Sequence, residues 1–114
     1  MAQGYKNLIV WQKSIKLVIL IYELTKTFPS SEIYGLTSQM KRSGVSIPSN
    51  IAEGSKRRTQ KDFKHFIAIA LGSGAELETQ IEISKQLKLG NSEVCKEIDN
   101  LLAEVMKMLT SMLL

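Results

Sequence analysis

The sequence SIPSNIAEGSKRR, residues 46–58, decides how the chain is organised, because it closes one helical pattern and opens the longest one. Pro48 lies inside the first pattern, where it removes a backbone donor and crowds the carbonyl of Gly44, four residues earlier. Gly44 has no side chain to add to that crowding, so we expect a kinked helix rather than a broken one. Gly54 suits the left-handed position after a helix C-terminus, which predicts a turn there.

Cations gather around this turn. Between residues 41 and 64 they are Lys41, Arg42, Lys56, Arg57, Arg58, Lys61 and Lys64. Lys61 and Lys64 fall in the first turns of the next predicted helix, where the helix dipole disfavours positive charge, so their placement points to a function. The pattern fits a capped loop with solvated cations or a patch that faces an anion, and composition does not choose between them.

Length and composition predict one folded domain over residues 1–114. The sequence is 44% hydrophobic and 23% charged, as in ordinary globular proteins. We expect a cytoplasmic protein without a membrane partner, because there is no signal sequence, no apolar run of about 20 residues and a single cysteine. Residues 1–64 carry a net charge of +7, with 11 Lys and Arg against 4 Asp and Glu. Residues 65–114 carry −3, with 4 against 7, which indicates a polyanion partner or complementary subunit surfaces.

Apolar residues between about 7 and 28 follow a helical period in two neighbouring stripes. The first stripe contains Leu8, Trp11, Ile15, Val18 and Tyr22, and the second contains Val10, Leu17, Ile21, Leu24 and Phe28. One antiparallel bundle uses one stripe per helix, so the surplus predicts contact between subunits. The residues expected at that oligomer interface are Val10, Leu17, Ile21, Ile69 and Ile83.

Three further helical patterns follow. Ser30 and Ser31 are expected N-caps of a helix that continues through Ile33, Leu36, Met40, Ile47 and Ile51. Small residues between these positions indicate close packing against a neighbouring helix rather than a ligand groove. Thr59 begins the third helix, and Asn91 or Ser92 caps the fourth, whose expected core stripe is Val94, Ile98, Leu101, Val105, Met108 and Met112. The sequence therefore predicts an all-α, antiparallel up-down-up-down four-helix bundle.

Asn50 and Glu53 lie one helical turn apart, so at least one of them must approach the packed side. We expect both to be structural and partly buried rather than catalytic. A buried carboxylate needs a partner, and the candidates for Glu53 are Arg42 or an arginine after Gly54.

Catalytic candidates are few. His65 is the single histidine and lies in a basic stretch, which favours a solvated side chain. Cys95 has no histidine near it in sequence and is expected to be buried or inert. Glu76, Glu78 and Glu82 suggest a metal site, but a di-iron bundle needs histidines on two helices. We therefore expect no enzyme activity, no cofactor and no metal.

Several segments together resemble the four-helix-bundle family first noticed as proteins encoded in intervening sequences of 23S ribosomal RNA genes. They are residues 8–12 (LIVWQ), 34–36 (YGL), 46–54 (SIPSNIAEG), 57–58 (RR), Phe63, 70–73 (ALGS) and 76–78 (ELE). The resemblance spans residues 5 to about 90. It implies a left-handed bundle that assembles as a homopentamer and has no known enzymatic activity. The accessory protein of diversity-generating retroelements is a more distant relative, a basic pentamer that binds nucleic acid and a reverse transcriptase.

Two functions of different classes fit the sequence. In the first, the seven cations of residues 41–64 face RNA or DNA, bound mainly through its backbone because recognised base-reading motifs are absent. In the second, the protein is a structural or protein-interaction scaffold, and its cations pair with the acidic half of neighbouring subunits.

Overall fold

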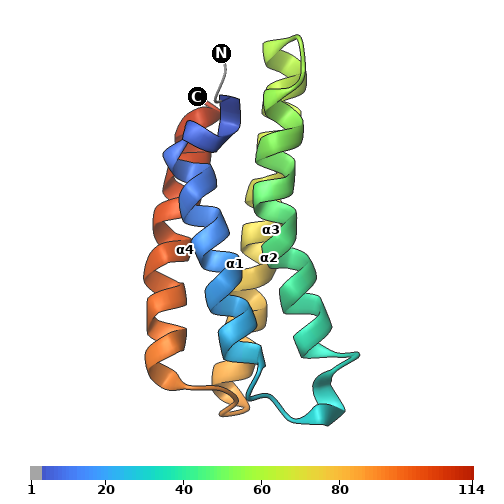
Figure 1. Ribbon diagram of the computed structural model, residues 1–114, viewed down its shortest axis with the longest axis vertical. Helices are drawn as coiled ribbons and strands as arrows, with labels where there is room; N and C mark the ends of the chain where they lie inside the picture. The colour runs from blue at the N-terminus through green and yellow to red at the C-terminus, as the bar shows by residue number, and fades with distance from the viewer. Residues whose placement is uncertain (1–3) are drawn as a thin grey trace.

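The structure is a computed structural model that describes residues 4–114. It contains η1 (Gly4–Asn7), α1 (Ile9–Thr25), η2 (Ser30–Glu32), α2 (Leu36–Ser55), α3 (Gln60–Gln86) and α4 (Ser92–Met112), where η marks short 3-10 helices. Successive helices run in opposite directions, as Figure 1 shows. α1 and α3 each pack against both α2 and α4, so α1 and α3 occupy opposite corners of the bundle. The predicted all-α four-helix bundle is thus confirmed.

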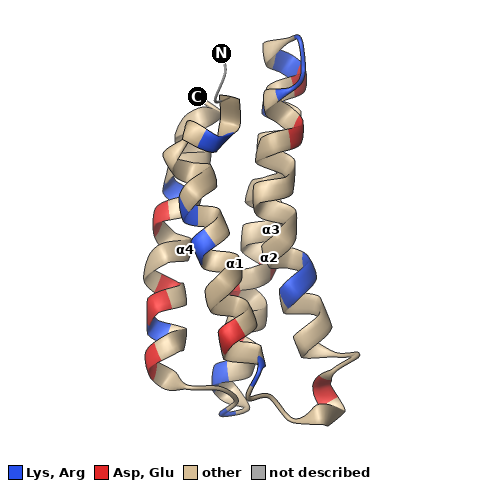
Figure 2. Cartoon of the chain, in the orientation of Figure 1, with Lys and Arg blue, Asp and Glu red and all other residues tan. Residues whose placement is uncertain are grey.

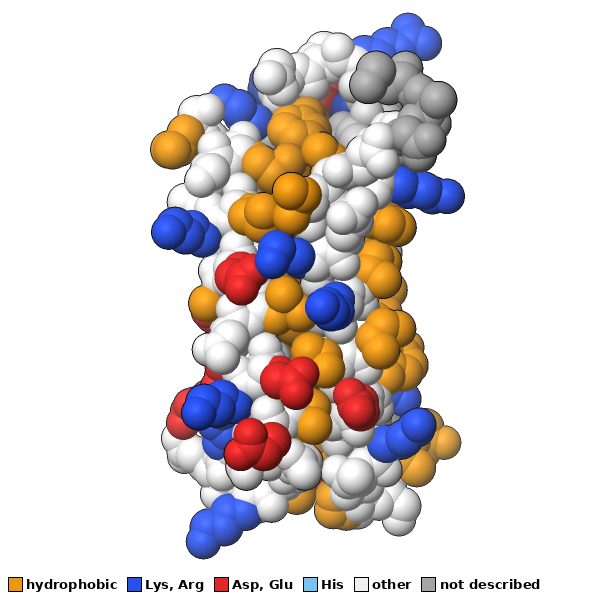
Figure 3. Space-filling view, turned by 60° about the vertical axis from the view of Figure 1, so that its left-hand side comes forward, with side chains coloured by type: hydrophobic (Ala, Val, Ile, Leu, Met, Phe, Trp, Pro, Cys, Tyr) orange, Lys and Arg blue, Asp and Glu red, His pale blue; other side chains and the backbone are white. Residues whose placement is uncertain are grey.

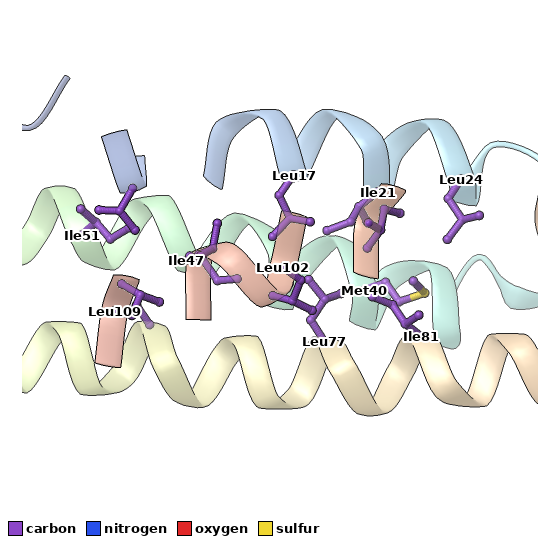
Figure 4. Packing of buried hydrophobic residues seen from close by; sticks show 14 of the residues in the cluster. Leu17, Ile21, Leu24, Met40, Ile47, Ile51, Leu77, Ile81, Leu102 and Leu109 are labelled. Carbon is purple, nitrogen blue, oxygen red and sulfur yellow. The ribbon is translucent and has the colours of Figure 1, made fainter. Parts of the chain in front are cut away.

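The molecule is elongated, with extents of 43 × 24 × 22 Å. η1 and the C-terminal end of α4 lie at the same end of the bundle, and the connection between α2 and α3 extends past them (Figure 1). We call this projecting end, residues 53–64, the tip. The core that supports it is aliphatic along the bundle axis and includes Leu17, Ile21, Ile47, Leu77 and Leu102, each at most 2% exposed (Figure 4). Burying side chains of this size stabilises a fold by about 1.5–3 kcal/mol each.

The predicted subunit-facing stripe of α1 is wrong. Val10, Leu17 and Ile21 are buried inside their own chain at 4%, 0% and 0% exposure, whereas Ile15 and Tyr22 of the other stripe are exposed. The core stripe passes through Ser14, a polar residue that hid the continuity of the pattern. Its hydroxyl donates to the Trp11 carbonyl at 2.7 Å, so it is satisfied within α1.

Side chains mark three helix starts, and one of them lies later than predicted. Thr59 Oγ1 accepts from the Asp62 amide, and Asn91 Oδ1 accepts from two amides of α4, which confirms both as N-caps. α2, however, begins at Leu36 rather than after Ser30 and Ser31. Glu32 Oε1 accepts a hydrogen bond from the Leu36 amide at 3.1 Å. The first amides of α2 have no partner within the helix, and this bond satisfies one of them, so α2 begins at Leu36.

Candidate nucleic-acid interface

The tip is built from the end of α2, a short connection and the start of α3. Lys56 is the C-cap of α2, and Thr59 is the N-cap of α3. The two helix ends therefore place the side chains of Lys56, Arg57, Arg58 and Lys61 on the outermost surface of the bundle, all exposed. Figure 2 shows their colour gathered at the projecting end.

Gly54 positions the tip in a different way from the one predicted. It lies inside α2 and has no positive φ, so it is not a left-handed cap. A Cβ added to it would lie 2.9 Å from Phe66 Cβ and 3.3 Å from the Phe63 carbonyl oxygen. Gly54 is therefore required by the close approach of α2 and α3 rather than by its backbone conformation.

Arg57 is held in place on two sides. Its Nη2 donates to Glu53 Oε2 at 2.6 Å, and its guanidinium lies 4.6 Å from the centre of the Phe66 ring. Glu53 thus has the expected kind of partner, an arginine after Gly54. Its side chain is 54% exposed, however, so the prediction that it is partly buried is wrong. An exposed pair four residues apart on a helix is worth about 0.3–0.5 kcal/mol, which orients Arg57 but hardly stabilises the fold.

The N-terminal segment adds a cation that the sequence pattern did not reveal. η1 packs against α2, and Lys56 Nζ lies 5.7 Å from the centre of the Tyr5 ring. Lys6, next to Tyr5, is exposed at this same end. Lys64 lies closer to the chain end, where its Nζ donates to the Leu114 carbonyl oxygen at 3.4 Å. The basic surface therefore draws on both ends of the sequence.

Lys41 and Arg42 are not part of this surface. Fifteen residues separate Lys41 from Lys56 along one continuous helix, which corresponds to about 22 Å. Lys41 Nζ instead lies 4.6 Å from the centre of the Tyr22 ring of α1. Figure 2 shows basic residues in the first half of α2, well apart from those at the tip.

A hollow of about 480 Å³ lies directly beside the tip cations. Apolar side chains of Leu8, Phe63 and Met112 line it together with Arg57 and Arg58. Such a surface offers both charge and apolar area to a ligand at the same place.

The polar motif in α2 is structural. α2 continues through Pro48, which is buried, so the helix is not broken there. Asn50 is partly buried, as predicted, and its Nδ2 donates to the Ser46 carbonyl and hydroxyl at 2.8 and 2.9 Å. The Ser46 and Ser73 hydroxyls then share a hydrogen bond of 2.8 Å between α2 and α3. This chain of bonds satisfies polar groups where α2 and α3 share the most extensive contact between any two helices described.

Other chemically reactive side chains do not converge on the tip. His65 is exposed and packs edge-on against Phe66, while Cys95 is buried on α4. Burial raises the pKa of the Cys95 thiol, which Asp99 also raises and Lys85 lowers. A hydrogen bond with Asp99 raises the pKa of Lys85.

Within residues 4–114, no cluster of three or more His, Cys, Asp or Glu could hold a metal ion. Glu76, Glu78 and Glu82 are exposed on α3. None of the helices described has the length and apolar character needed to cross a membrane.

Comparisons with known proteins give a family and a solved structure of similar fold. A crystal structure of a protein of unknown function, of the S23 ribosomal protein family from Bacteroides thetaiotaomicron, superposes with a TM-score of 0.84 at 28% identity. The match covers 92% of this chain and 98% of the other. No curated protein matches the sequence significantly. The model of the family described as 23S rRNA-intervening sequence protein matches residues 6–111, so the chain belongs to that family.

Proposed function

We propose that the protein is a non-enzymatic homo-oligomer that binds RNA or DNA through the tip, without strong sequence specificity. The observation that carries this proposal is the gathering of Lys56, Arg57, Arg58 and Lys61 on one projecting end of the bundle. Lys64 and Lys6 extend the same surface. The assembly that the family resemblance implies is a homopentamer.

The geometry of the tip suits phosphate better than base edges. Arg57 is oriented by Glu53 and by the Phe66 ring, so part of the cost of ordering it is already met before binding. Arg58 and Lys61 are exposed and form no ion pair in the part of the chain described. Flexible, solvated cations contact phosphates and position a nucleic acid without reading its sequence.

The tip also offers more than charge. The hollow lined by Leu8, Phe63 and Met112 lies against Arg57 and Arg58 and can receive an unstacked base of a single strand. Bases on aromatic or guanidinium surfaces add affinity without sequence preference. We therefore expect single-stranded RNA or DNA to bind at least as well as a duplex.

A binding experiment with a matched control tests this function. The Arg58→Ala/Lys61→Ala variant removes two free tip cations and spares the Arg57–Glu53 pair. The Lys88→Ala/Lys96→Ala variant removes the same charge from exposed residues at the opposite end of the bundle. Fluorescence anisotropy with random-sequence RNA and DNA oligonucleotides at several salt concentrations compares the three proteins.

We expect the tip variant to bind all sequences more weakly, with a salt slope reduced by about 0.7–0.9 per lost phosphate contact. The control variant should retain nearly the wild-type slope. Equal affinity of the wild type and the tip variant would reject the tip as a nucleic-acid site. That result would favour the alternative function, a structural or protein-interaction scaffold without a nucleic-acid ligand, which the exposed isoleucines of α1 and α3 support.

A further inference from the structure

A cavity of about 530 Å³ lies between the end of α3 and the start of α4, at the opposite end of the bundle from the tip. We call it the α3–α4 cavity. Leu89 and Cys95 form its apolar wall, and Cys95 is only 5% exposed. Gly90, also in the lining, lies directly against Leu24 and Phe28. Cavities of this size hold small organic molecules in many proteins.

The residues that line the α3–α4 cavity carry a net charge of +2. Three are lysines, Lys85, Lys88 and Lys96, and one is acidic, Asp99. Lys85 Nζ pairs with Asp99, so these two charges compensate each other. Lys88 and Lys96 are exposed and form no ion pair within residues 4–114. The cavity therefore presents two uncompensated cations beside an apolar wall.

Lys88 has a backbone conformation that is unusual for its residue type. Its φ is 57°, and among residues 4–114 it is the one non-glycine residue with a positive φ. The Lys88 and Leu89 amides donate to the carbonyls of Lys85 and Ser84 at 3.0 and 2.9 Å, a pattern that ends many helices and usually places glycine at this position. Strain of this kind is concentrated at binding sites, where a particular side chain is needed. Here the strained position holds one of the two free cations of the cavity.

We propose that the α3–α4 cavity binds a small phosphate monoester that carries an apolar body, such as an aromatic ring. A phosphate monoester has a charge of about −1.5 to −2 at neutral pH, which matches the two free lysines. Lysine binds phosphate as a point charge, and the Ser92 hydroxyl in the lining can donate a hydrogen bond to a phosphate oxygen. The apolar body packs against Leu89 and Cys95. This site is separate from the tip and goes beyond nucleic-acid binding.

The surroundings of the cavity favour a small anion over a polymer. α4 continues from the cavity with four acidic residues, Glu93, Glu97, Asp99 and Glu104. Figure 3 shows acidic side chains gathered on the lower half of the molecule, with basic side chains projecting at its end. A nucleic-acid strand that extends past the cavity would meet these carboxylates and be repelled. A phosphate monoester that fits inside the cavity avoids them.

Alkylation of Cys95, the single cysteine of the chain, reports on occupation of the cavity. The probes are 1-naphthyl phosphate, 1-naphthol, which has the same ring without the phosphate, and inorganic phosphate, which has no ring. The rate of reaction with iodoacetamide is followed by mass spectrometry. At about ten times its Kd, 1-naphthyl phosphate should slow the reaction by about tenfold, because only the unliganded fraction reacts. The other two probes at the same concentration should have little effect.

Each probe can overturn part of the reasoning. Absence of protection by 1-naphthyl phosphate overturns the site itself. Equal protection by 1-naphthol shows that the phosphate contributes nothing, and equal protection by inorganic phosphate shows that the apolar wall contributes nothing. Either result overturns the assignment of the ligand class.

Two double variants locate the bound probe. Lys88→Gly/Lys96→Ala removes both free cations of the cavity and should weaken binding of 1-naphthyl phosphate in calorimetric titration by roughly tenfold or more. Arg58→Ala/Lys61→Ala should bind it as the wild type does. The opposite pattern would place the probe at the tip and overturn the proposal. Oligonucleotide binding should show the reverse dependence on the two variants, so failure at one site is distinguishable from failure at the other.

The single variant Lys88→Gly tests why a lysine occupies the strained position. Glycine adopts a positive φ without a steric penalty, so this variant should unfold at a higher urea concentration than the wild type. It should also bind 1-naphthyl phosphate more weakly, because one free cation is lost. Lys96→Ala should weaken binding without raising the urea midpoint. A Lys88→Gly variant that binds as tightly as the wild type overturns the role of Lys88 in the site.

Discussion

Gly54→Ala should destabilise the protein, although the same change usually stabilises a helix. Alanine in place of glycine inside a helix normally gains about 1 kcal/mol. At this position the new Cβ would lie 2.9 Å from Phe66 Cβ, well inside the 3.5–4.0 Å of a good carbon contact. Phe66 Cβ is attached to the α3 backbone and cannot rotate away, so the two helices must separate locally.

The expected magnitude follows from these two opposed effects. Overpacking in a close-packed region costs about 1–3 kcal/mol, and the propensity gain returns about 1 kcal/mol. The net loss in unfolding free energy should therefore be about 1 kcal/mol, and up to about 2 kcal/mol. Urea denaturation followed by circular dichroism measures it, with all variants at one protein concentration because assembly links stability to concentration.

Gly74→Ala is the matched control. Its new Cβ would fall closest to the sulfur of Met106, which lies far along a flexible side chain and can move. We expect the unfolding free energy of this variant to lie within about 1 kcal/mol of the wild-type value and well above that of Gly54→Ala. An increase of about 1 kcal/mol in the unfolding free energy of Gly54→Ala would refute the close-packing argument.

Two further predictions test the core. Leu17→Ala should lower the unfolding free energy by about 2–5 kcal/mol because Leu17 is fully buried, whereas Ile19→Ala, 63% exposed, should change that of a dilute monomer by less than about 0.5 kcal/mol. Similar losses in urea denaturation would contradict the assignment of the core stripe. Cys95 of the folded protein should react with iodoacetamide at pH 8 more slowly than the same thiol in urea. Burial limits the access of the reagent, and it raises the pKa of the thiol, so that a smaller fraction is thiolate. Equal rates would contradict this.

Local signals made much of the fold predictable. Thr59 and Asn91 were recognisable as N-caps because a cap depends on a side chain and the two or three residues after it. The core positions Met40, Ile47 and Ile51 of α2 followed from helical spacing alone, and all three are fully buried.

The errors arose where two local solutions compete. α1 offers two apolar stripes of similar quality, and packing against α2 and α4 rather than the sequence of α1 decides which is buried. Ser14 made the true core stripe look interrupted, although its hydroxyl is satisfied by the Trp11 carbonyl. Gly54 was predicted to cap α2 because a glycine near a helix end has two common explanations. It can adopt the left-handed conformation of a cap, or it can allow a neighbouring helix to approach closely, and the sequence does not distinguish them.

The candidate site was predictable in part because most of its cations are close in sequence. The cations from Lys56 to Lys64 surround one connection between helices, so they had to lie near one another. Lys41 belongs to the same sequence cluster but lies about 22 Å away from Lys56, because a continuous helix keeps distant residues apart. Lys6 was missed because its position depends on the packing of η1 against α2, which no spacing pattern encodes.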